Sequence, residues 1–548
     1  MNWHIIDSTI PQSAAELREI LVKNLQLTNS DDFFSPKHPL DVSLAEVGID
    51  EGQLETAIDR ILLALKKQEK IVVFGDYDAD GVCSTAILWQ ALHTMGCQVI
   101  PFIPHREKHG YGLSTKALDD LLAETKPKLI VTVDNGIVAH EPAKRVLDAG
   151  IDLIITDHHQ PEEKLPPSTA VIHSTQLCGA TVSWMFSREI LKARGEEITP
   201  DWQLDLAAIA TIADQVPLRG VNRSFAKFGL RALRNSTRVG LKALLAQANM
   251  DQKIINSQSV GFGIAPRINA MGRLGHSLDA LRLLLTINKN RAEILAKTLG
   301  ETNSTRQEMT FEMYGDALSQ SEQWKNDNLI IVHSDKYHEG VVGLIAGRLM
   351  EQFYKPVIAI SVSNGIAKAS ARSIPGVNIV ELIREVRDDL LDVGGHPMAA
   401  GFGLEENKLE KVILRLKELA LEKIDKKLLE PKIDVEAVIP FSLINEKTIE
   451  MIDGFAPFGQ GNEEPILGFK DAEVLQVFTM GKDNQHLKVV CKGNGGIVPI
   501  NFLFWRKGSL AEKITQKDKI NFAGILEINE WRGKKSVQIR VKDIEFAS

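Results

Sequence analysis

Three carboxylates alternate with other residues in the sequence GDYDADG, at Asp76, Asp78 and Asp80. Like charges this close repel one another at neutral pH and force one pKa upward unless a cation neutralises the group. The spacing therefore predicts a bound metal ion. Asp and Gly also form turns, so a turn without a ligand is the simpler alternative. The string imitates an EF-hand loop as well, but residues 82–87 supply no Glu at loop position 12, which excludes that interpretation.

Acidic and imidazole side chains recur beyond this motif. The further positions are Asp134, Asp157, His158, His159 and Asp214. Mixed carboxylate and imidazole ligands favour manganese over calcium, with magnesium or another first-row metal as further candidates. A pair of such ions activates a water and holds the attacking and leaving oxygens of a displacement at phosphorus. We therefore expect two divalent cations, Mn²⁺ or Mg²⁺, as cofactors.

Short apolar runs precede most of these positions. Residues 71–74, 129–133 and 151–155 have strand length and are separated by stretches with helical periodicity. This alternation predicts an α/β unit with buried parallel strands. Because ligands of open α/β sheets lie at the carboxyl ends of the strands, we expect the clusters to converge at one sheet edge.

The chain has 548 residues, too many for one ordinary core, so we expect several domains. Residues 277–323 lack proline and are rich in helix-forming residues, which predicts long connecting helices. A second α/β segment is expected at residues 328–423. Beyond residue 431, short runs of alternating apolar and polar residues predict a small β-barrel, with an OB-fold favoured.

Charge is distributed unevenly along the chain. The net charge of −8 does not favour a polyanionic partner overall, yet residues 488–542 hold twelve Lys or Arg against four Asp or Glu. Proteins that bind single-stranded nucleic acids combine aromatic side chains with cations, although a strand tryptophan more often lies in a core. The candidate nucleic-acid contacts in this segment are Lys488, Trp505, Arg506, Trp531 and Lys534.

Nothing in the sequence points to a membrane or to secretion. No apolar run approaches the roughly 20 residues that a membrane-spanning helix needs. The N-terminus lacks the basic region and apolar run of a secretory signal. Four scattered cysteines form no CxxC pair, which argues against a disulfide framework or a structural zinc site. We therefore expect a cytoplasmic protein.

The order of the motifs resembles that of the DHH phosphoesterase superfamily, with DYDADG, DNG, DHH and ADQVP in turn. From about Ile71 to the C-terminus, the chain is most similar to the RecJ branch, the bacterial single-stranded-DNA-specific exonucleases. The resemblance implies a set of direct metal ligands, in which Asp134 bridges the two ions. These ligands are Asp78, Asp80, Asp134, His158 and Asp214. It gives Asp76, Asp157 and His159 the roles of orienting ligands and of donating to phosphoryl oxygens.

Three segments look like parts of the DHH-associated domain of these enzymes. They are HEGVVG, which contains His338, then SARSIPG, and then GGH. In that domain the GGH loop, here Gly394, Gly395 and His396, helps to hold the scissile phosphate. For GGH taken alone, a simple turn is the better interpretation.

Two further groups of residues match RecJ. Arg106, Ser370 and Arg372 match positions that bind the 5′-terminal phosphate, which guanidinium groups suit by bidentate geometry. The second group lies in the segment 261–274 and consists of candidate contacts of the DNA backbone, namely Arg267, Asn269 and Arg273. Helix capping and surface ion pairs are the alternative roles of these residues.

The combined expectation is a multidomain α/β protein with five parts. They are an N-terminal segment at 1–45, a parallel-sheet DHH catalytic domain at 46–225, a helical connector at 226–325, a DHH-associated domain at 326–427 and an OB-fold-like nucleic-acid-binding domain at 428–548. His173-Ser174 stands where the family shows Asn-Pro, and Tyr337 replaces a tryptophan, so cleft width and processivity stay open.

The implied function is 5′ to 3′ exonuclease activity on single-stranded DNA, with release of 5′ mononucleotides by two-metal hydrolysis, in DNA repair and recombination. Two alternatives remain: a DHH phosphodiesterase for short oligoribonucleotides or cyclic dinucleotides, and a non-catalytic DNA-binding scaffold. The complete ligand set argues against the scaffold. The resemblance also implies a single-stranded-DNA-binding protein and a helicase as partners, and we expect a monomer.

Overall fold

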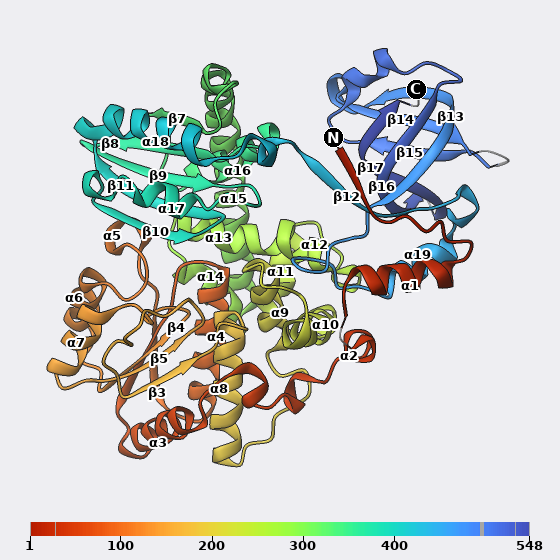
Figure 1. Ribbon diagram of the computed structural model, residues 1–548. Helices are drawn as coiled ribbons and strands as arrows, with labels where there is room; N and C mark the ends of the chain where they lie inside the picture. Colours follow the sequence, from red (N-terminus) through yellow and green to blue (C-terminus); the bar gives the residue numbers. More distant parts are fainter. Residues whose placement is uncertain (1, 28, 494–497, 532, 547–548) are drawn as a thin grey trace. The chain divides into compact units, whose positions relative to one another are not determined.

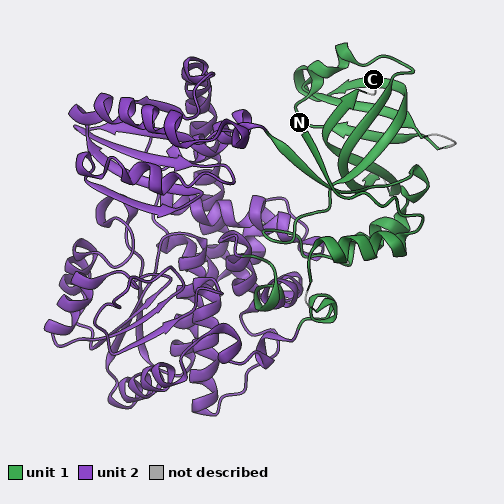
Figure 2. Ribbon diagram, viewed as in Figure 1, with its two compact units in different colours: residues 1–36, 217–223, 431–548 green, residues 37–216, 224–430 purple. Residues whose placement is uncertain are grey.

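The computed structural model describes residues 2–27, 29–493, 498–531 and 533–546. The chain forms two compact units (Figure 2). The larger comprises residues 37–216 and 224–430, and the smaller comprises residues 1–36, 217–223 and 431–548. The N-terminal segment thus belongs to the same unit as the C-terminal barrel, which the sequence did not predict. In the described ranges, no helix has both the length and the apolar character needed to cross a bilayer.

The first sheet of the larger unit is parallel throughout, in the order β3-β2-β4-β5-β6. Its strands are β2 (Lys70–Phe74), β3 (Gln98–Phe102), β4 (Leu129–Val133), β5 (Asp152–Asp157) and β6 (Ala170–His173). The residues of β4 are all buried, because helices cover both faces of the sheet. The carboxyl ends of the strands form one edge, as expected for a parallel sheet.

Helices pack on the two faces of this sheet (Figure 1). One face is covered by α6 (Thr115–Glu124) and α7 (His140–Asp148), and the other by α4 (Ala79–Thr94) and α8 (Gly179–Arg194). The sheet is flanked further by α3 (Glu51–Lys67) and by the short α5 (Arg106–His109).

A helical segment connects this sheet to the next. It contains α9 (Leu204–Ala213), α10 (Gly220–Asn235), α11 (Val239–Gln247), α12 (Ser257–Ser259), a π-helical turn (Val260–Ile264), α13 (Ala265–Leu274), α14 (Leu278–Leu285) and α15 (Lys289–Ser321). The predicted long helix is confirmed by α15, which has 33 residues.

The second sheet of the larger unit has the order β10-β11-β9-β8-β7, with only the β7–β8 pair parallel in the described residues. Its strands are β7 (Ile330–Ser334), β8 (Val357–Ser363), β9 (Ile366–Arg372), β10 (Asp392–His396) and β11 (Ala399–Glu405). Helix α16 (Val342–Phe353) packs on one face, and α17 (Ile379–Arg384) and α18 (Leu409–Lys423) pack on the other.

The smaller unit contains a barrel of five strands among its described residues. They are β13 (Leu467–Met480), β14 (His486–Lys492), β15 (Ile500–Phe504), β16 (Lys519–Trp531) and β17 (Lys534–Phe546), and pairing of β13 with β16 closes the barrel. Alternate residues of β14 are buried inside, which confirms the predicted small barrel.

The N-terminal strand extends the barrel sheet. Strand β1 (Asn2–Asp7) pairs in parallel with β12 (Lys432–Val438), which in turn pairs with β13. Leu17 and Leu21 of α1 (Ala14–Asn24) share a core with Ile449 and Ile452 of α19 (Glu446–Asp453). The short helix α2 (Ser30–Phe34) contributes Phe33 to the same core. Residues from both ends of the chain therefore fold as one unit.

Candidate metal centre

The first acidic motif forms the turn between β2 and α4. Asp78 caps α4, and its Oδ1 accepts a hydrogen bond from the backbone N–H of Gly81 at 3.0 Å. A Cβ at Gly81 would lie 2.6–2.7 Å from backbone atoms of Asp76, so only glycine permits this tight turn. Asp76 and Asp80 are 2% and 1% exposed, respectively. The turn therefore holds two buried carboxylates and one helix-capping carboxylate at the sheet edge.

Asp134 follows β4 and is 3% exposed, with its backbone in the left-handed region at φ 62°. The next residue, Asn135, fixes this conformation. Its side-chain amide donates to the carbonyl of Val133 at 2.8 Å and to that of Phe74 at 3.4 Å, and its oxygen accepts from the N–H of Leu113 at 3.1 Å. The Asp134 loop is thereby tied to the end of β2.

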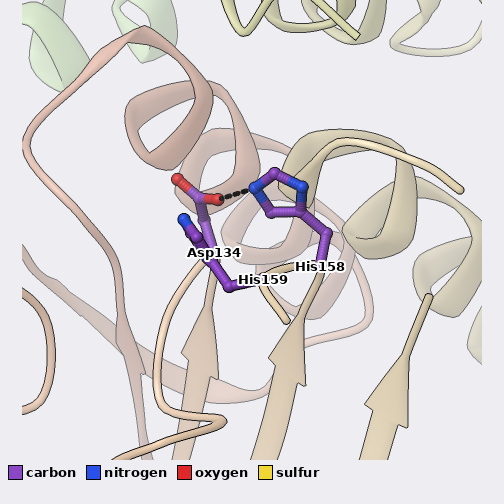
Figure 3. Close-up of side chains that lie close together, drawn as sticks. All are labelled: Asp134, His158 and His159. Atoms are coloured by element: carbon purple, nitrogen blue, oxygen red, sulfur yellow. Dashed lines mark ion pairs between the residues drawn. The ribbon is translucent and has the colours of Figure 1, made fainter. Parts of the chain in front are cut away.

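Strand β5 ends at Asp157, and the two histidines that follow it point in different directions. Asp157 accepts hydrogen bonds from the N–H of Ile137 at 2.9 Å and bonds Nδ1 of His159 at 2.7 Å. Nε2 of His158 lies 3.2 Å from Oδ1 of Asp134 (Figure 3). Nδ1 of His158 lies 3.8 Å from Oδ2 of Asp214, which caps the C-terminus of α9.

The clusters converge at one sheet edge, as the sequence predicted. Potential ligand atoms lie within 4.8 Å of one another in three groups: Asp134, His158 and His159; Asp80, His158 and Asp214; and Asp76, Asp78 and Asp134. Asp134 and His158 each belong to two groups, so the groups form one continuous centre. Which side chains ligate an ion stays a prediction.

The carboxylates of this centre are poorly neutralised by the protein itself. Burial, together with the neighbouring acids, raises the pKa of Asp134 and of Asp76 well above the usual value. The same causes raise the pKa of Asp80 to about 7 and that of Asp214 to about 9. Among the described residues, Oδ1 of Asp76 and Oδ1 of Asp134 are buried and accept no hydrogen bond, although Nε2 of His158 lies 3.2 Å from the latter. Because unpaired buried carboxylate oxygens are costly, this donor set fits divalent cations.

The two histidines have opposite protonation preferences. Burial, and then the charge of His159, lowers the pKa of His158 to about 4, so this imidazole is neutral and can offer a lone pair. Burial also opposes a charge on His159, but the hydrogen bond and the charge of Asp157 outweigh it and raise the pKa of His159 to about 9. Nε2 of His159 lies 3.0 Å from the hydroxyl of Tyr111. His159 is therefore suited to donate a hydrogen bond to an anion.

Unpaired arginines lie in the same unit as the acidic centre. The Arg106 guanidinium lies 5.3 Å from the centre of the Tyr77 ring, and Nη1 of Arg372 donates to Oγ of Ser370 at 3.2 Å. Nη1 of Arg273 donates to the carbonyl of Gly340 at 2.8 Å. Burial, and then the charges of Arg106 and other arginines, lowers the pKa of Arg273 to about 10. Among the described residues, none of these three arginines forms an ion pair with a carboxylate, so together they suit an anion.

Arg306 of α15 is a cation that the sequence analysis missed. Its Nε is buried and has no hydrogen-bond partner in the described ranges of the chain, and its charge acts on Arg273. In the sequence, Arg306 is one of several charged residues in a predicted helix. Without the fold, nothing distinguished it from an arginine at the protein surface.

Asn269 and Arg267, two of the predicted DNA-backbone contacts, and His338 bind other parts of the protein. Oδ1 of Asn269 accepts from the backbone N–H of Ala79 at 2.7 Å and so holds the first turn of α4. Arg267 donates to Oε1 of Gln247 at 2.9 Å and to the carbonyl of Gly263 at 2.8 Å. Nδ1 of His338 accepts from the N–H of Gly340 at 3.0 Å.

The GGH sequence lies in β10. Gly394, Gly395 and His396 pair with β11, and a Cβ at Gly395 would lie 2.6 Å from Cα of Ala400. The side chain of His396 is exposed and, within the ranges that the structure describes, forms no hydrogen bond or ion pair. The glycine at 395 thus serves close packing of two strands, while His396 is free to meet a ligand.

The barrel presents aromatic and cationic side chains on its outside. Trp505 is 53% exposed, and its ring packs edge-on against His486 at 4.8 Å between ring centres. The backbone N–H of Arg506 donates to Nδ1 of His486 at 3.0 Å. Lys488 lies directly across from Phe478, which is also exposed and which the sequence analysis missed. Lys534 begins β17 and is exposed, whereas the side chain of Trp531 lies outside the described part of the structure.

Three family models match the chain, in the order that the fold suggests. The DHH family N-terminal domain matches residues 70–211, the DHHA1 domain matches residues 326–422 and the RecJ OB domain matches residues 435–543.

Full-length relatives show the same similarity. The chain is 37% identical to the single-stranded-DNA-specific exonuclease RecJ of Bacillus subtilis over 89% of this chain, but it spans only 63% of that relative, less than two thirds of its length. It is 33% identical to the single-stranded-DNA-specific exonuclease RecJ of Salmonella typhimurium, with 90% of each chain covered.

Crystal structures of RecJ from Thermus thermophilus have the same fold. The structure in complex with Mn²⁺ matches with a TM-score of 0.83 at 29% identity, over all of this chain and 80% of that one. The structure in complex with Mg²⁺ matches with a TM-score of 0.77 at 28% identity, over all of this chain and 79% of that one. With its three domains in the same order and with relatives above 30% identity along most of its length, the chain belongs to the RecJ family of the DHH superfamily.

Proposed function

We propose that this protein is a metal-dependent exonuclease that degrades single-stranded DNA from the 5′ end and releases 5′ mononucleotides. One observation carries the proposal: a buried acidic and imidazole centre lies in the same unit as a group of arginines that have no carboxylate partner among the described residues. The positive charge of Arg106 acts directly on Asp76 of the centre. A site that favours cations thus adjoins one that favours phosphate, as hydrolysis at a DNA end requires. The names of the relatives support the substrate.

The metal ligands that we propose are Asp78, Asp80, Asp134, His158 and Asp214. Two divalent ions held there would supply an activated water and neutralise charge on the leaving oxygen. Asp76 joins the ligand set, because one of its carboxylate oxygens lies within 4.8 Å of ligand atoms of Asp78 and Asp134. His158 offers a neutral nitrogen. Asp157 holds His159 as a charged donor, which can bond a phosphoryl oxygen.

Polarity would come from the terminal phosphate. Arg106, Ser370 and Arg372 would bind it, because a terminal phosphate carries more charge than an internal diester and offers oxygens for bidentate bonding. Arg273 would add a further positive charge. His338, Gly394, Gly395 and His396 would hold the scissile phosphate, while Arg267 and Asn269 would support the helices around the DNA.

The other expectations extend the proposal. The barrel would track the strand through Lys488, Trp505, Arg506, Trp531 and Lys534. We keep the division into residues 1–45, 46–225, 226–325, 326–427 and 428–548, with the first part folding on the last. A cytoplasmic monomer that works with a single-stranded-DNA-binding protein and a helicase, in repair and recombination, completes the proposal.

The test compares single strands labelled at the 3′ end that carry a 5′ phosphate, a 5′ hydroxyl or a blocked 5′ end, with Mn²⁺ or Mg²⁺. We expect mononucleotide release, fastest from the phosphorylated strand, and no activity after chelation. Equal degradation of the blocked strand would overturn the polarity. Faster turnover of short oligoribonucleotides or cyclic dinucleotides would favour the short-substrate alternative, and DNA binding without cleavage would favour the scaffold.

A further inference from the structure

The first turn of helix α8 lies so close to the metal centre that a side chain at position 179 would clash with it. The backbone N–H groups of Gly179 and Ala180 donate to Oδ2 and Oδ1 of Asp80, both at 2.7 Å. Both oxygens of a carboxylate that is 1% exposed are thereby fixed by one helix end. The orientation of Asp80 depends on how near α8 can come.

Gly179 also faces Asp134. A Cβ at position 179 would lie 2.6 Å from Cβ of Asp134 and 2.7 Å from its Cγ. Rotation about χ1 cannot relieve the first contact, because the position of a Cβ is set by the backbone. The backbone of Asp134 is in turn constrained at φ 62° by the hydrogen bonds of Asn135. Either α8 or the Asp134 loop would have to move.

The same turn is connected to the helix that carries Asp214. The hydroxyl of Thr181 donates to the carbonyl of Cys178 at 2.8 Å, and Sγ of Cys178 lies 3.8 Å from Oγ1 of Thr211. Thr211 belongs to α9, which ends at Asp214. One turn of α8 therefore contacts Asp80 and Asp134 directly and contacts the helix that places Asp214.

We propose that Gly179 is a positioning residue of the metal centre, whose missing side chain sets the separation between Asp80 and Asp134. A side chain at this position would force the two carboxylates apart and weaken the binding of divalent cations, although it removes no ligand. This inference rests on the proposed function, because it assumes that Asp80 and Asp134 bind metal.

A purely structural role for Gly179 makes a different prediction. If Gly179 served only the packing of α8, Gly179→Ala would destabilise the protein with and without metal alike. Separation of Asp80 from Asp134 instead relieves repulsion between them in the metal-free protein. The variant should therefore be less stable than the wild type only when metal is bound. Metal affinity and metal-free stability therefore distinguish the two roles.

The experiment uses the full chain, stripped with a chelator, and titrates Mn²⁺ while free Mn²⁺ is followed by electron paramagnetic resonance. Gly179→Ala should bind Mn²⁺ at least about tenfold more weakly, as changes around metal ligands do. Its thermal unfolding without metal should stay within a few degrees of the wild type, and the rise in Tm on adding Mn²⁺ should shrink. Gly315→Ala is the matched control, since Gly315 is a helical glycine of α15 with open space where a Cβ would lie.

Equal Mn²⁺ affinity of Gly179→Ala and wild type would overturn the inference and leave the proposed function standing. Absence of Mn²⁺ binding by the wild type would overturn the proposed function and the inference together. A Gly179→Ala chain that does not fold even without metal would assign Gly179 to the packing of α8 and would also overturn the inference.

Discussion

The carboxyl edge of the first parallel sheet and the outer surface of the barrel present their functional side chains in opposite ways. At the sheet edge, Asp80 and Asp134 are almost completely buried and are held by backbone hydrogen bonds or strained backbone. On the barrel, Trp505 is half exposed and Lys534 lies in solvent. Burial makes the acids costly without a cation, whereas exposed groups cost the fold little. The proposed metal centre therefore costs the fold more stability than the proposed DNA-binding surface of the barrel.

Removal of one buried acid tests the first half of this comparison and should have the largest effect. Asp134→Asn should reduce nuclease activity on the order of 10³-fold or more, because the charge that holds the cations is lost. The stripped variant should nevertheless unfold at a higher temperature than the stripped wild type, since burial and four neighbouring acids raise the pKa of Asp134. A lower Tm for the stripped variant would contradict the view that this carboxylate is held at a cost.

The pH dependence of stability should reveal the same cost. The folded-state pKa values of Asp80 and Asp214, about 7 and about 9, lie above the ordinary Asp value, so both groups bind protons more tightly in the folded state. Their contribution to stability is complete below pH 3.8 and is lost as pH rises through those values. His159, with its pKa raised to about 9, acts in the same direction, and His158 acts oppositely only below pH 6.5.

The Tm of the stripped protein should therefore fall between pH 6.5 and pH 9. Saturating Mn²⁺ should reverse or flatten this trend, because a cation competes with protons for the same oxygens and binds better as pH rises. Differential scanning calorimetry of the stripped protein and of the protein with saturating Mn²⁺ measures Tm at each pH. A pH-independent Tm of the stripped protein in this range would show that the acids are neutralised within the chain.

The arginine group should control polarity with a smaller effect. Arg372→Ala should lower kcat/KM for 5′-phosphorylated DNA about 10- to 100-fold, the loss expected from charge-assisted hydrogen bonds. For a strand with a 5′ hydroxyl, kcat/KM should change much less. Arg415→Ala is the control, since Arg415 is an exposed arginine of α18 that pairs with Glu418. An equal loss on both substrates would assign Arg372 to the scissile phosphate or to folding.

The sequence predicted the parallel sheet and the convergence of its acidic motifs, because strand periodicity and carboxyl-edge positions are local properties of the chain. It did not predict that β1 pairs with β12, because β1 carries no motif and its partner lies more than 400 residues away. It offered Asn269 as a DNA-backbone contact, which stays a prediction, and it did not predict the hydrogen bond that Oδ1 of Asn269 accepts from the N–H of Ala79. The sequence shows which groups a side chain can bond, but the fold decides which of them is near.

Gly179 shows the limit in another way. The chain has 40 glycines, and nothing in the letters around position 179 separates it from the others. Its significance comes from the short distance between the Cβ that any other residue would carry here and the side chain of Asp134, which only the folded structure supplies. Positioning residues that act by the absence of a side chain are therefore the least visible to sequence reasoning.

The barrel prediction tests the second half of the comparison and should have the smallest effect. Truncation at residue 431 would not test it, because Leu17 and Leu21 would lose the core that they share with α19. Trp505→Ala should instead weaken the binding of long single strands by about 1–3 kcal/mol, the range for one base stacked on an aromatic ring. Turnover of a dinucleotide should not change.

Phe546→Ala is the matched control for Trp505→Ala, since Phe546 is similarly exposed at the end of β17. Fluorescence anisotropy with labelled strands of increasing length, at two salt concentrations, measures the binding. If Trp505 stacks on a base, the loss of binding free energy caused by Trp505→Ala should increase with strand length until the strand is long enough to contact the barrel. For longer strands the loss should stay constant. Lys488→Ala should instead reduce the salt dependence, because a cation that contacts phosphate releases counterions. Equal losses for dinucleotides and long strands would place Trp505 in the catalytic machinery and erase the contrast between the two regions.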